Sequence, residues 1–356
     1  NAPVRHRLHQ RFRKKESLEM AHYLITGHTG FKGAWLTFLL KAHGHQVSGL
    51  SLDPLPGSIF ERSELANDLV HDFRIDIRNR QETIDAVRMA QPDYLIHMAA
   101  QALVRESYIR PAYTYEVNVN GTLNILEAVD RTESVHAQLI VTTDKVYREE
   151  TFAKPFVEAD PLGGRDPYGV SKAMADLLAQ EYLARASSKP GSIVRAGNVV
   201  GLGDVSKDRL IPDMLNAWNK KMPVKIRNRH HVRPWQHVLD CLTGYLLVLH
   251  ERKEKSPVAY NIGPDATVGL SVGEILPIVE ESLSGIEFEF EDDESDWYEN
   301  PNLILDTSLM RRELGWSPAL SSVDAIQWAV EPHPNVRPGA SPRDSIQAQI
   351  SRFLQR

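Results

Sequence analysis

Cysteine is almost absent from this chain of 356 residues, and Cys241 is the only one. A single cysteine excludes an intrachain disulfide and argues against a cysteine-based metal site. Sparing use of cysteine is typical of proteins in a reducing compartment, so we expect a cytoplasmic protein.

Long apolar runs and an excess of one charge are also missing. No apolar run reaches the roughly 18 residues that a membrane-spanning helix needs, so no membrane partner is expected. The 41 basic and 47 acidic residues leave a net charge of -6, which gives no reason to expect a nucleic acid as partner. The 14 histidines show no metal-ligand spacing, so we expect no metal. The 42% hydrophobic content is typical of a globular protein.

Short apolar strands alternate with helical stretches from His22 to Ala196. Strands are expected at 22–26, 46–52, 72–77, 94–98, 138–143 and 192–196, and helices at 34–42, 80–90, 115–129 and 168–185. This alternation predicts an α/β protein with a Rossmann-type, doubly wound parallel sheet. Ligands of such sheets bind beyond the carboxyl ends of the strands.

A glycine-rich loop joins the first strand to the first helix. Gly27, Gly30 and Gly33 follow a Gly-x-x-Gly-x-x-Gly pattern. Glycines at this turn allow the backbone to approach a pyrophosphate, which the helix N-terminus stabilises. The loop therefore predicts a dinucleotide site. The candidate cofactor residues are Gly27, His28, Thr29, Gly30, Phe31, Gly33, Ser51, Asp53, Asp76, Ile77, Ala99, Ala100, Gln101, Tyr168 and Lys172.

The ends of the later strands suggest how the cofactor lies. Ser51 occupies the position where an acidic residue would bind the ribose of NAD, and Asp53 either reaches that ribose or caps a loop. We prefer NAD to NADP. Asp76 suits the adenine edge, with an ordinary loop aspartate as the alternative. The small side chains of Ala99 and Ala100 let the nicotinamide half pass close by.

Two further motifs carry chemistry. Tyr168 and Lys172 are four residues apart, which places a phenol and an ammonium on one face of a helix. The ammonium lowers the pKa of the phenol, so that Tyr168 can accept a proton during oxidation of an alcohol. Thr143, Asp144 and Lys145 follow the fifth strand and add an acid beside an amine. Oxidation alone does not need that pair, but an elimination does.

These motifs together resemble CDP-glucose 4,6-dehydratases of the extended short-chain dehydrogenase/reductase superfamily, from about residue 20 to 330. The matching strings are ITGHTGFKGAWL (25–36), QALVR (101–105), TDKVY (143–147), PLGGRDPY (161–168), RAGNVVG (195–201) and RPWQHVLD (233–240). The Asp144-Lys145 pair discriminates most, because dTDP-glucose dehydratases carry Asp-Glu there. Gly169-Val170 departs from the pattern, where serine and alanine are common, but removes no catalytic group.

The resemblance implies conversion of CDP-glucose to CDP-4-keto-6-deoxyglucose with NAD. Tyr168 would take the proton of the C4 hydroxyl, and Lys172 would hold Tyr168 ionised and position the ribose. Thr143 would bind the C4 oxygen, Asp144 would protonate the leaving C6 hydroxyl, and Lys145 would remove the C5 proton. Lys145 has an alternative role as an ion pair that shapes the site. The candidate substrate ligands are Arg105, Asn198, Arg233 and His237. Arg105 has the alternative of pairing with a nearby acid.

The resemblance also suggests an organisation. We expect a flexible basic leader at 1–19 with Met20 as the native start, an NAD-binding domain at 20–200 with returning segments from 230–265, a mainly substrate-binding domain at 201–331, and a tail at 332–356. A homodimer through the helices starting near Tyr115 and Tyr168 is implied. The alternatives are another sugar-nucleotide dehydratase, a 4-epimerase, or a catalytically silent dinucleotide sensor.

Overall fold

A computed structural model describes residues 20–148, 154–251, 259–264, 269–291, 303–331 and 341–356. The expected basic leader at 1–19 lies outside the described residues. The strands are β1 His22–Thr26, β2 Gln46–Ser51, β3 Asp72–Arg74, β4 Tyr94–His97, β5 Ala137–Thr143, β6 Gly191–Ala196, β7 Val199–Val200, β8 Val224–Ile226, β9 Val232–Arg233, β10 Gln236–His237, β11 Ala259–Ile262, β12 Leu270–Ser271 and β13 Phe288–Phe290.

The helices are α2 Phe31–Ala42, α3 Ile59–Arg62, α4 Arg80–Ala90, α5 Val104–Ile109, α6 Pro111–Tyr115, α7 Gly121–Asp130, α8 Pro167–Arg185, α9 Leu210–Asn219, α10 Val238–Glu251, α11 Val272–Ser282, α12 Ser308–Leu314, α13 Ser322–Val330 and α14 Pro342–Phe353. None of the described helices is long and apolar enough to cross a membrane.

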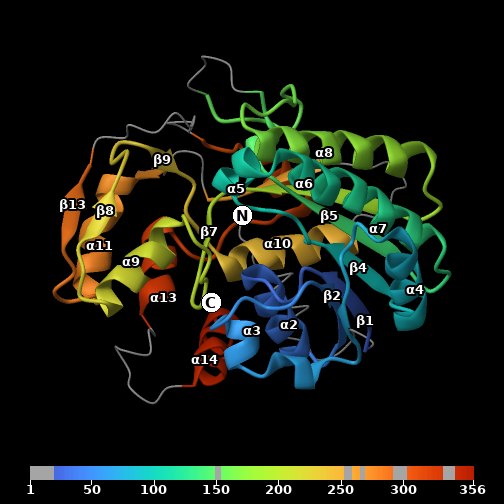
Figure 1. The fold of residues 1–356 in the computed structure, drawn as a ribbon, viewed down its shortest axis with the longest axis horizontal. Helices are drawn as coiled ribbons and strands as arrows, with labels where there is room; N and C mark the ends of the chain where they lie inside the picture. Colours follow the sequence, from blue (N-terminus) through green and yellow to red (C-terminus); the bar gives the residue numbers. More distant parts are fainter. Residues whose placement is uncertain (1–19, 149–153, 252–258, 265–268, 292–302, 332–340) are drawn as a thin grey trace.

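The main sheet confirms the expected Rossmann-type architecture. Its seven strands run in the order β11-β6-β5-β4-β1-β2-β3, and every neighbouring pair is parallel. The order reverses beside β1, so the carboxyl ends of β1 and β4 meet at a switch point where such sheets bind ligands. Helices cover both faces of the sheet (Figure 1).

Alternating side chains explain the two covered faces. Tyr23 and Ile25 of β1 pack in one core with α2, α10 and α14, whereas Leu24 packs in another with α4 and α7. Successive residues of a strand point to opposite faces, and both faces of a parallel sheet are buried. The expected strands are therefore apolar throughout.

Several expected boundaries were wrong by a few residues. The third strand ends at Arg74 instead of residue 77, because the chain turns there and the Asp76 carbonyl accepts the Asn79 amide. The first helix begins at Phe31 rather than at residue 34. The helix expected at 115–129 is interrupted, since Glu116–Asn120 forms a π-helical turn between α6 and α7. Helix α8 begins one residue early, at Pro167.

Residues beyond 200 build a second core. Ile211 of α9, Ile226 of β8, Ile275 of α11 and Ile326 of α13 share one apolar cluster. These elements lie together on one side of the main sheet, at the left in Figure 1. The division into domains at residue 200 stays a prediction.

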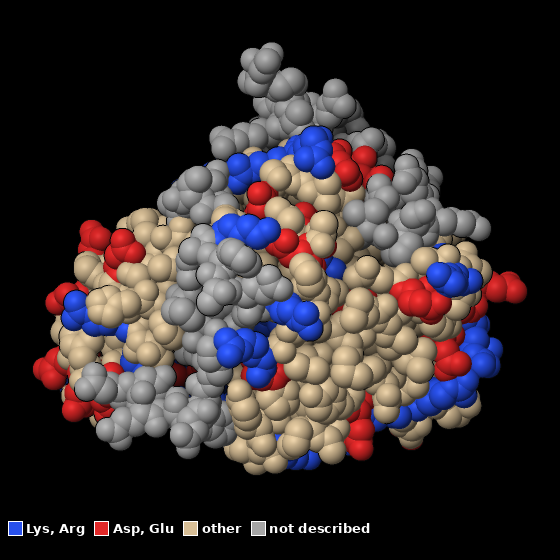
Figure 2. All heavy atoms as spheres, turned by 90° about the horizontal axis from the view of Figure 1, so that it is seen from above, with Lys and Arg blue, Asp and Glu red and all other residues tan. Residues whose placement is uncertain are grey.

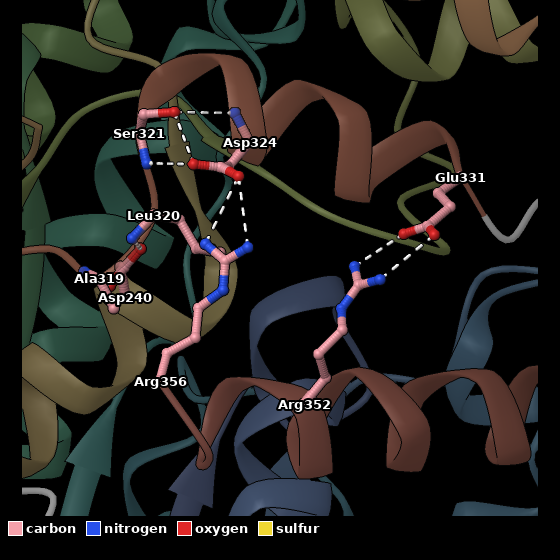
Figure 3. A network of polar contacts seen from close by, with 8 residues as sticks. All are labelled: Asp240, Ala319, Leu320, Ser321, Asp324, Glu331, Arg352 and Arg356. Carbon is pink, nitrogen blue, oxygen red and sulfur yellow. Dashed lines mark hydrogen bonds and ion pairs between the residues drawn. The ribbon is translucent and has the colours of Figure 1, made fainter.

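The C-terminal segment contains a docked helix. Ile346, Ile350 and Phe353 of α14 are buried in the same core as α2. Arg352 donates to Glu331 at 2.7 and 3.2 Å, which ties α14 to the end of α13 (Figure 3). Helix α14 lies within the segment expected as a tail, and it begins at Pro342 because Ser341 caps it and Pro342 suits its first turn.

The surface carries both signs of charge. On the face drawn in Figure 2, Lys and Arg side chains are interspersed with Asp and Glu among the described residues. Ion pairs at the surface of the described residues include Arg80 with Glu127 and Lys225 with Glu291. This mixture is consistent with the modest net charge of -6.

Candidate active site

The glycine loop is closely packed against the end of β4. Gly27 has a φ of +76°, and a Cβ there would lie 2.9 Å from the Ala99 backbone nitrogen. A Cβ on Gly33 would lie 2.3 Å from the Gly27 carbonyl oxygen. Both positions therefore require glycine. Gly30 precedes α2, whose first turn holds no acidic residue, so the helix N-terminus can receive an anion.

The loop threonine and the end of β2 form the expected ribose region. The hydroxyls of Thr29 and Ser51 are hydrogen bonded at 2.8 Å. Asp53 is exposed two residues further on. His28 lies differently, because its ring is fully buried and bonded to Asp72 at 2.8 Å. A ring in that position leaves only the backbone of His28 to contact a cofactor.

The other candidate cofactor residues lie in two places, after β3 and after β4. Asp76 is partly exposed and paired with Arg78 at 2.7 Å, while Ile77 is buried. Gln101 is buried, and its carboxamide already bonds Leu103 and Thr114. The small residues Ala99 and Ala100 precede it in the loop after β4. Asn118 braces this loop through two hydrogen bonds to the Gln101 backbone.

Helix α8 presents Tyr168 and Lys172 as the sequence predicts. Asp166 caps the helix by accepting the Gly169 amide at 2.8 Å, and Pro167 occupies the first helical position. Tyr168 lies in the first turn and Lys172 one turn later. The Lys172 ammonium donates to the Val141 carbonyl at 2.9 Å. This bond anchors α8 to β5, the strand that carries the second motif.

Burial shifts the pKa values of both groups. Burial raises the pKa of Tyr168 to about 12, against the opposing effects of a hydrogen bond with Thr143 and the nearby charge of Arg209. The pKa of Lys172 is lowered to about 8, first by burial and then by the charge of Lys32. A second positive charge beside Lys172 favours an anionic neighbour.

Thr143 and Asp144 lie directly beside Tyr168. The Thr143 hydroxyl donates to Asp144 Oδ1 at 2.9 Å, and both residues are buried. Asp144 Oδ2 has no hydrogen-bond partner in the described residues and faces Gly197, where a Cβ would lie 2.9 Å from it. Burial raises the pKa of Asp144 despite the Thr143 bond and the charge of Lys145. A neutral carboxyl with a free oxygen is suited to give a proton to a ligand.

Lys145 follows in a short helical turn. Its ammonium is 3.7 Å from Asp166 Oδ2, the same carboxylate that caps α8. This contact is the ion pair that the sequence left open as an alternative role. About a fifth of the Lys145 side chain stays exposed, at 20%. An ion pair at 3.7 Å leaves the Lys145 amine able to contact a ligand as well.

The four expected substrate ligands do not share one environment. Arg233 is buried, and its charge acts on Asp144. Asn198 is partly buried just after β6. Arg105 pairs with Asp208 at 2.8 Å, the alternative that the sequence left open. His237 is fully buried between the rings of Trp35 and Trp328, and such a setting favours packing over contact with a substrate.

Sequence reasoning missed Lys32 and Arg209. The Lys32 ammonium donates to the Tyr245 hydroxyl at 3.1 Å, and its pKa is lowered first by burial. Arg209 lies close enough for its charge to act on both Tyr168 and Lys32. A lysine directly before the third glycine of the loop, Gly33, was the available signal for Lys32. No comparable pattern marked Arg209, since its role depends on the fold of the loop before α9.

The fold and this site define a dinucleotide-binding α/β protein with a Tyr/Lys pair, and the chain belongs to the NAD dependent epimerase/dehydratase family, whose model matches residues 23–263. This confirms the superfamily expected from the sequence. The chain is 38% identical over 325 residues to a CDP-glucose 4,6-dehydratase of Salmonella typhimurium, covering 87% of this chain and 89% of the relative. A CDP-paratose 2-epimerase of Salmonella typhi is 26% identical over 85% of this chain and 96% of the relative.

Solved structures show the same fold. The dTDP-glucose 4,6-dehydratase DesIV of Streptomyces venezuelae, determined with NAD bound, matches with a TM-score of 0.78 and 25% identity, covering 90% of this chain and 99% of that one. A UDP-glucose 4-epimerase of Stenotrophomonas maltophila with bound NAD matches with a TM-score of 0.77 and 21% identity, covering 93% and 99%. Dehydratases and epimerases therefore share this scaffold.

Proposed function

We propose that the protein is a CDP-glucose 4,6-dehydratase that uses NAD. The observation that carries the proposal is the contact of two units: the Tyr168/Lys172 pair, and the buried Thr143-Asp144 pair followed by Lys145. The first unit suits oxidation of a hydroxyl, and the second suits loss of water. The 38% identity to a CDP-glucose 4,6-dehydratase supports the choice of nucleotide.

Oxidation at C4 makes the later steps possible. The C5 proton of the sugar is not acidic until C4 is a ketone, because only then is the carbanion an enolate. Tyr168 takes the C4 hydroxyl proton, Lys172 stabilises the phenolate, and Thr143 hydrogen bonds the C4 oxygen. NAD held by the glycine loop would supply an oxidised nicotinamide that can take up the hydride from C4, and its positive charge before that step would favour the phenolate. The glycine cradle at Gly27 and Gly33 fits such a cofactor.

Elimination then requires an acid and a base. Asp144 protonates the departing C6 hydroxyl, and burial raises the pKa of its carboxyl, which favours the protonated form that this step needs. Lys145 removes the C5 proton and returns it when the hydride is delivered to C6. Arg233, which is buried near Asp144, binds the substrate diphosphate, since a guanidinium can donate to two oxygens at once. An epimerase needs no acid and base for water loss.

A substrate panel tests this proposal. The protein with added NAD is incubated separately with CDP-, dTDP-, UDP- and GDP-linked hexoses, and the products are measured by mass spectrometry. Loss of one water from CDP-glucose alone is the expected result. Water loss only from another sugar nucleotide would keep the mechanism and replace the substrate. An isomer detected by NMR without a mass change would replace the dehydratase with an epimerase.

We also propose a homodimer in the cytoplasm. Helices α7 and α8 pack side by side. On α8, the large apolar side chains of Met174 and Leu177 are 45% and 53% exposed, and neighbouring exposed apolar side chains can mark an interface. Pairing of α7 and α8 with those of a second copy would cover them. Sedimentation of the protein should give a dimer, and Leu177→Glu should give a monomer, whereas Met89→Glu on α4 should not. The lone, buried Cys241 suits a reducing compartment.

A further inference from the structure

We propose that the Thr143 hydroxyl passes a proton from Tyr168 to Asp144 once in each turnover. The inference rests on the proposed dehydratase reaction and extends it, because it assigns Thr143 a second duty besides binding the C4 oxygen. The active site would thereby restore its own protonation state without drawing a proton from solvent.

The need for such a transfer follows from the balance of protons. Tyr168 gains the proton of the C4 hydroxyl, and Asp144 loses its proton to the C6 hydroxyl, which leaves as water. The C5 proton goes to Lys145 and returns to C5, and the hydride moves from C4 to C6 through NAD. At the end of a turnover, Tyr168 therefore holds one proton too many and Asp144 one too few.

The structure places one hydroxyl between these two groups. Thr143 Oγ1 is 2.9 Å from Asp144 Oδ1. The first turn of α8, which carries Tyr168, packs on the turn after β5, where a Cβ on Gly169 would lie 2.9 Å from the Lys145 carbonyl oxygen. Thr143 is close enough to Tyr168 to oppose the rise in the pKa of its phenol. In the transfer, the Tyr168 O–H bond breaks as its proton binds Thr143 Oγ1, and the original Thr143 O–H bond breaks as that proton binds Asp144 Oδ1. No electron is gained or lost, and both groups return to their starting forms.

Burial favours this internal route over exchange with solvent. Thr143 and Asp144 are 7% and 3% exposed. Asp144 Oδ2 has no hydrogen-bond partner within the described part of the chain, so the carboxyl can rotate about its Cβ–Cγ bond and present the new proton to the next substrate. The competing route would run through Lys172, whose ammonium is buried and bonded to the Val141 carbonyl.

The charge near the Tyr168 phenol determines the stage of the catalytic cycle at which the proton is transferred. In the absence of ligand, burial raises the pKa of Tyr168 to about 12, so the phenol keeps its proton. An oxidised nicotinamide bound beside the phenol would favour the phenolate and would drive the proton from Tyr168 toward Asp144. The transfer thus belongs at the end of the cycle, when the product is complete.

The test compares the first turnover with later ones. Thr143→Val keeps the shape of the side chain and removes the hydroxyl, and the variant with NAD is mixed rapidly with excess CDP-glucose. We expect product close to one equivalent per active site, followed by a steady rate slower by at least about tenfold. Thr143→Ser keeps the hydroxyl and should show no such burst. Thr142→Val, the same change one residue earlier, should show none either.

Two results would overturn the relay. The first is an equal slowing of the first and later turnovers by T143V, since Thr143 would then act only on oxidation. If T143V forms no product at all, phenolate absorbance decides, measured as the difference from Y168F. A relay predicts that Asp144→Asn shifts the pKa of Tyr168 more when Thr143 is present than in the T143V background. Equal shifts in the two backgrounds would be the second contrary result.

The proposed function is tested separately. Wild-type protein must convert CDP-glucose with loss of water before the burst is interpreted. A failure of wild-type conversion argues against the proposed substrate, whereas a normal wild type with equal slowing in T143V argues against the relay alone.

Discussion

Two neighbouring threonines of β5 face polar regions of opposite character. Thr142 donates to Asp176 at 2.9 Å, in a region where the buried polar atoms are paired. Thr143 donates to Asp144, whose other oxygen has no partner among the described residues. Successive residues of a strand point to opposite faces, so one strand can serve both regions. The comparison separates buried polar groups that stabilise the fold from those that are available to bind a ligand.

The paired region is a dense network. Arg195 of β6 donates twice to Asp176 of α8, at 2.8 and 2.9 Å, and once to the Tyr147 hydroxyl at 3.0 Å. Tyr147 in turn donates to Asn261 of β11 at 2.6 Å. The network joins the helix that carries Lys172 to three strands of the sheet. Its role is to hold those elements, since every group named here already has its partners.

The largest expected contrast is between two tyrosines. Tyr168→Phe should lower kcat by about 10²–10⁴-fold, because it removes the proposed base, and should leave the melting temperature nearly unchanged. Tyr147→Phe should leave kcat nearly unchanged. It should lower the free energy of unfolding by about 1–3 kcal/mol, because Arg195 and Asn261 lose a buried partner. Steady-state kinetics and urea unfolding measure both. Equal kinetic losses in the two variants would contradict the separation of the regions.

The second contrast lies in the two arginine ion pairs. Arg195→Met should cost about 3–5 kcal/mol of unfolding free energy, because it leaves Asp176 charged and buried without its partner. Arg105→Met should cost about 0–1 kcal/mol, because both side chains of the Arg105–Asp208 pair are exposed. Urea unfolding of the two variants checks the difference. A small loss in R195M would show that the network does not hold the fold.

The third prediction concerns Asp144, whose Oδ2 has no hydrogen-bond partner among the described residues. Asp144→Asn removes the proton for the leaving hydroxyl but keeps the shape of the side chain. Water loss should fall by about 10²–10⁴-fold, while oxidation at C4 continues and reduced cofactor accumulates. Absorbance of NADH after mixing with CDP-glucose reports this directly. Loss of elimination without any NADH signal would instead mean that Asp144 is needed for oxidation.

The last prediction concerns the pH dependence of stability and a buried acid outside both regions. Asp240 of α10 accepts the backbone amides of Ala319 and Leu320, and burial raises its pKa to about 7 (Figure 3). Because the unfolded value is near 3.9, the folded chain binds the extra proton between about pH 4 and 7. The contribution of Asp240 to stability should therefore decrease as pH rises through this window, by at most about 1.4 kcal/mol per pH unit.

Asp240→Asn isolates that contribution. The variant cannot ionise at this position, so its free energy of unfolding should vary less with pH than that of the wild type between about pH 4.5 and 7.5. Urea unfolding at several pH values measures the two slopes, and their difference belongs to Asp240. Identical slopes would mean that Asp240 titrates alike in the folded and unfolded chains.

Much of the site could be predicted because its parts are local. Gly27, Gly30 and Gly33 are spaced by the needs of one turn, and Tyr168 and Lys172 by one turn of helix. His237 illustrates the opposite case, because its motif matched a family string while its ring packs between two distant indoles. Arg105 likewise meets Asp208, more than a hundred residues away in the chain. Contacts of that kind leave no local pattern to detect.

The sequence by itself determined the parallel sheet, the glycine loop, the two chemical motifs and the family to which they belong. Each depends on short-range spacing, which the helix and strand periods impose on the chain. Only the tertiary structure decided which groups meet: Thr143 with both Tyr168 and Asp144, Lys145 with Asp166, and Lys32 with Tyr245. Those meetings depend on how strands and helices pack, and packing also sets the burial that shifts each pKa.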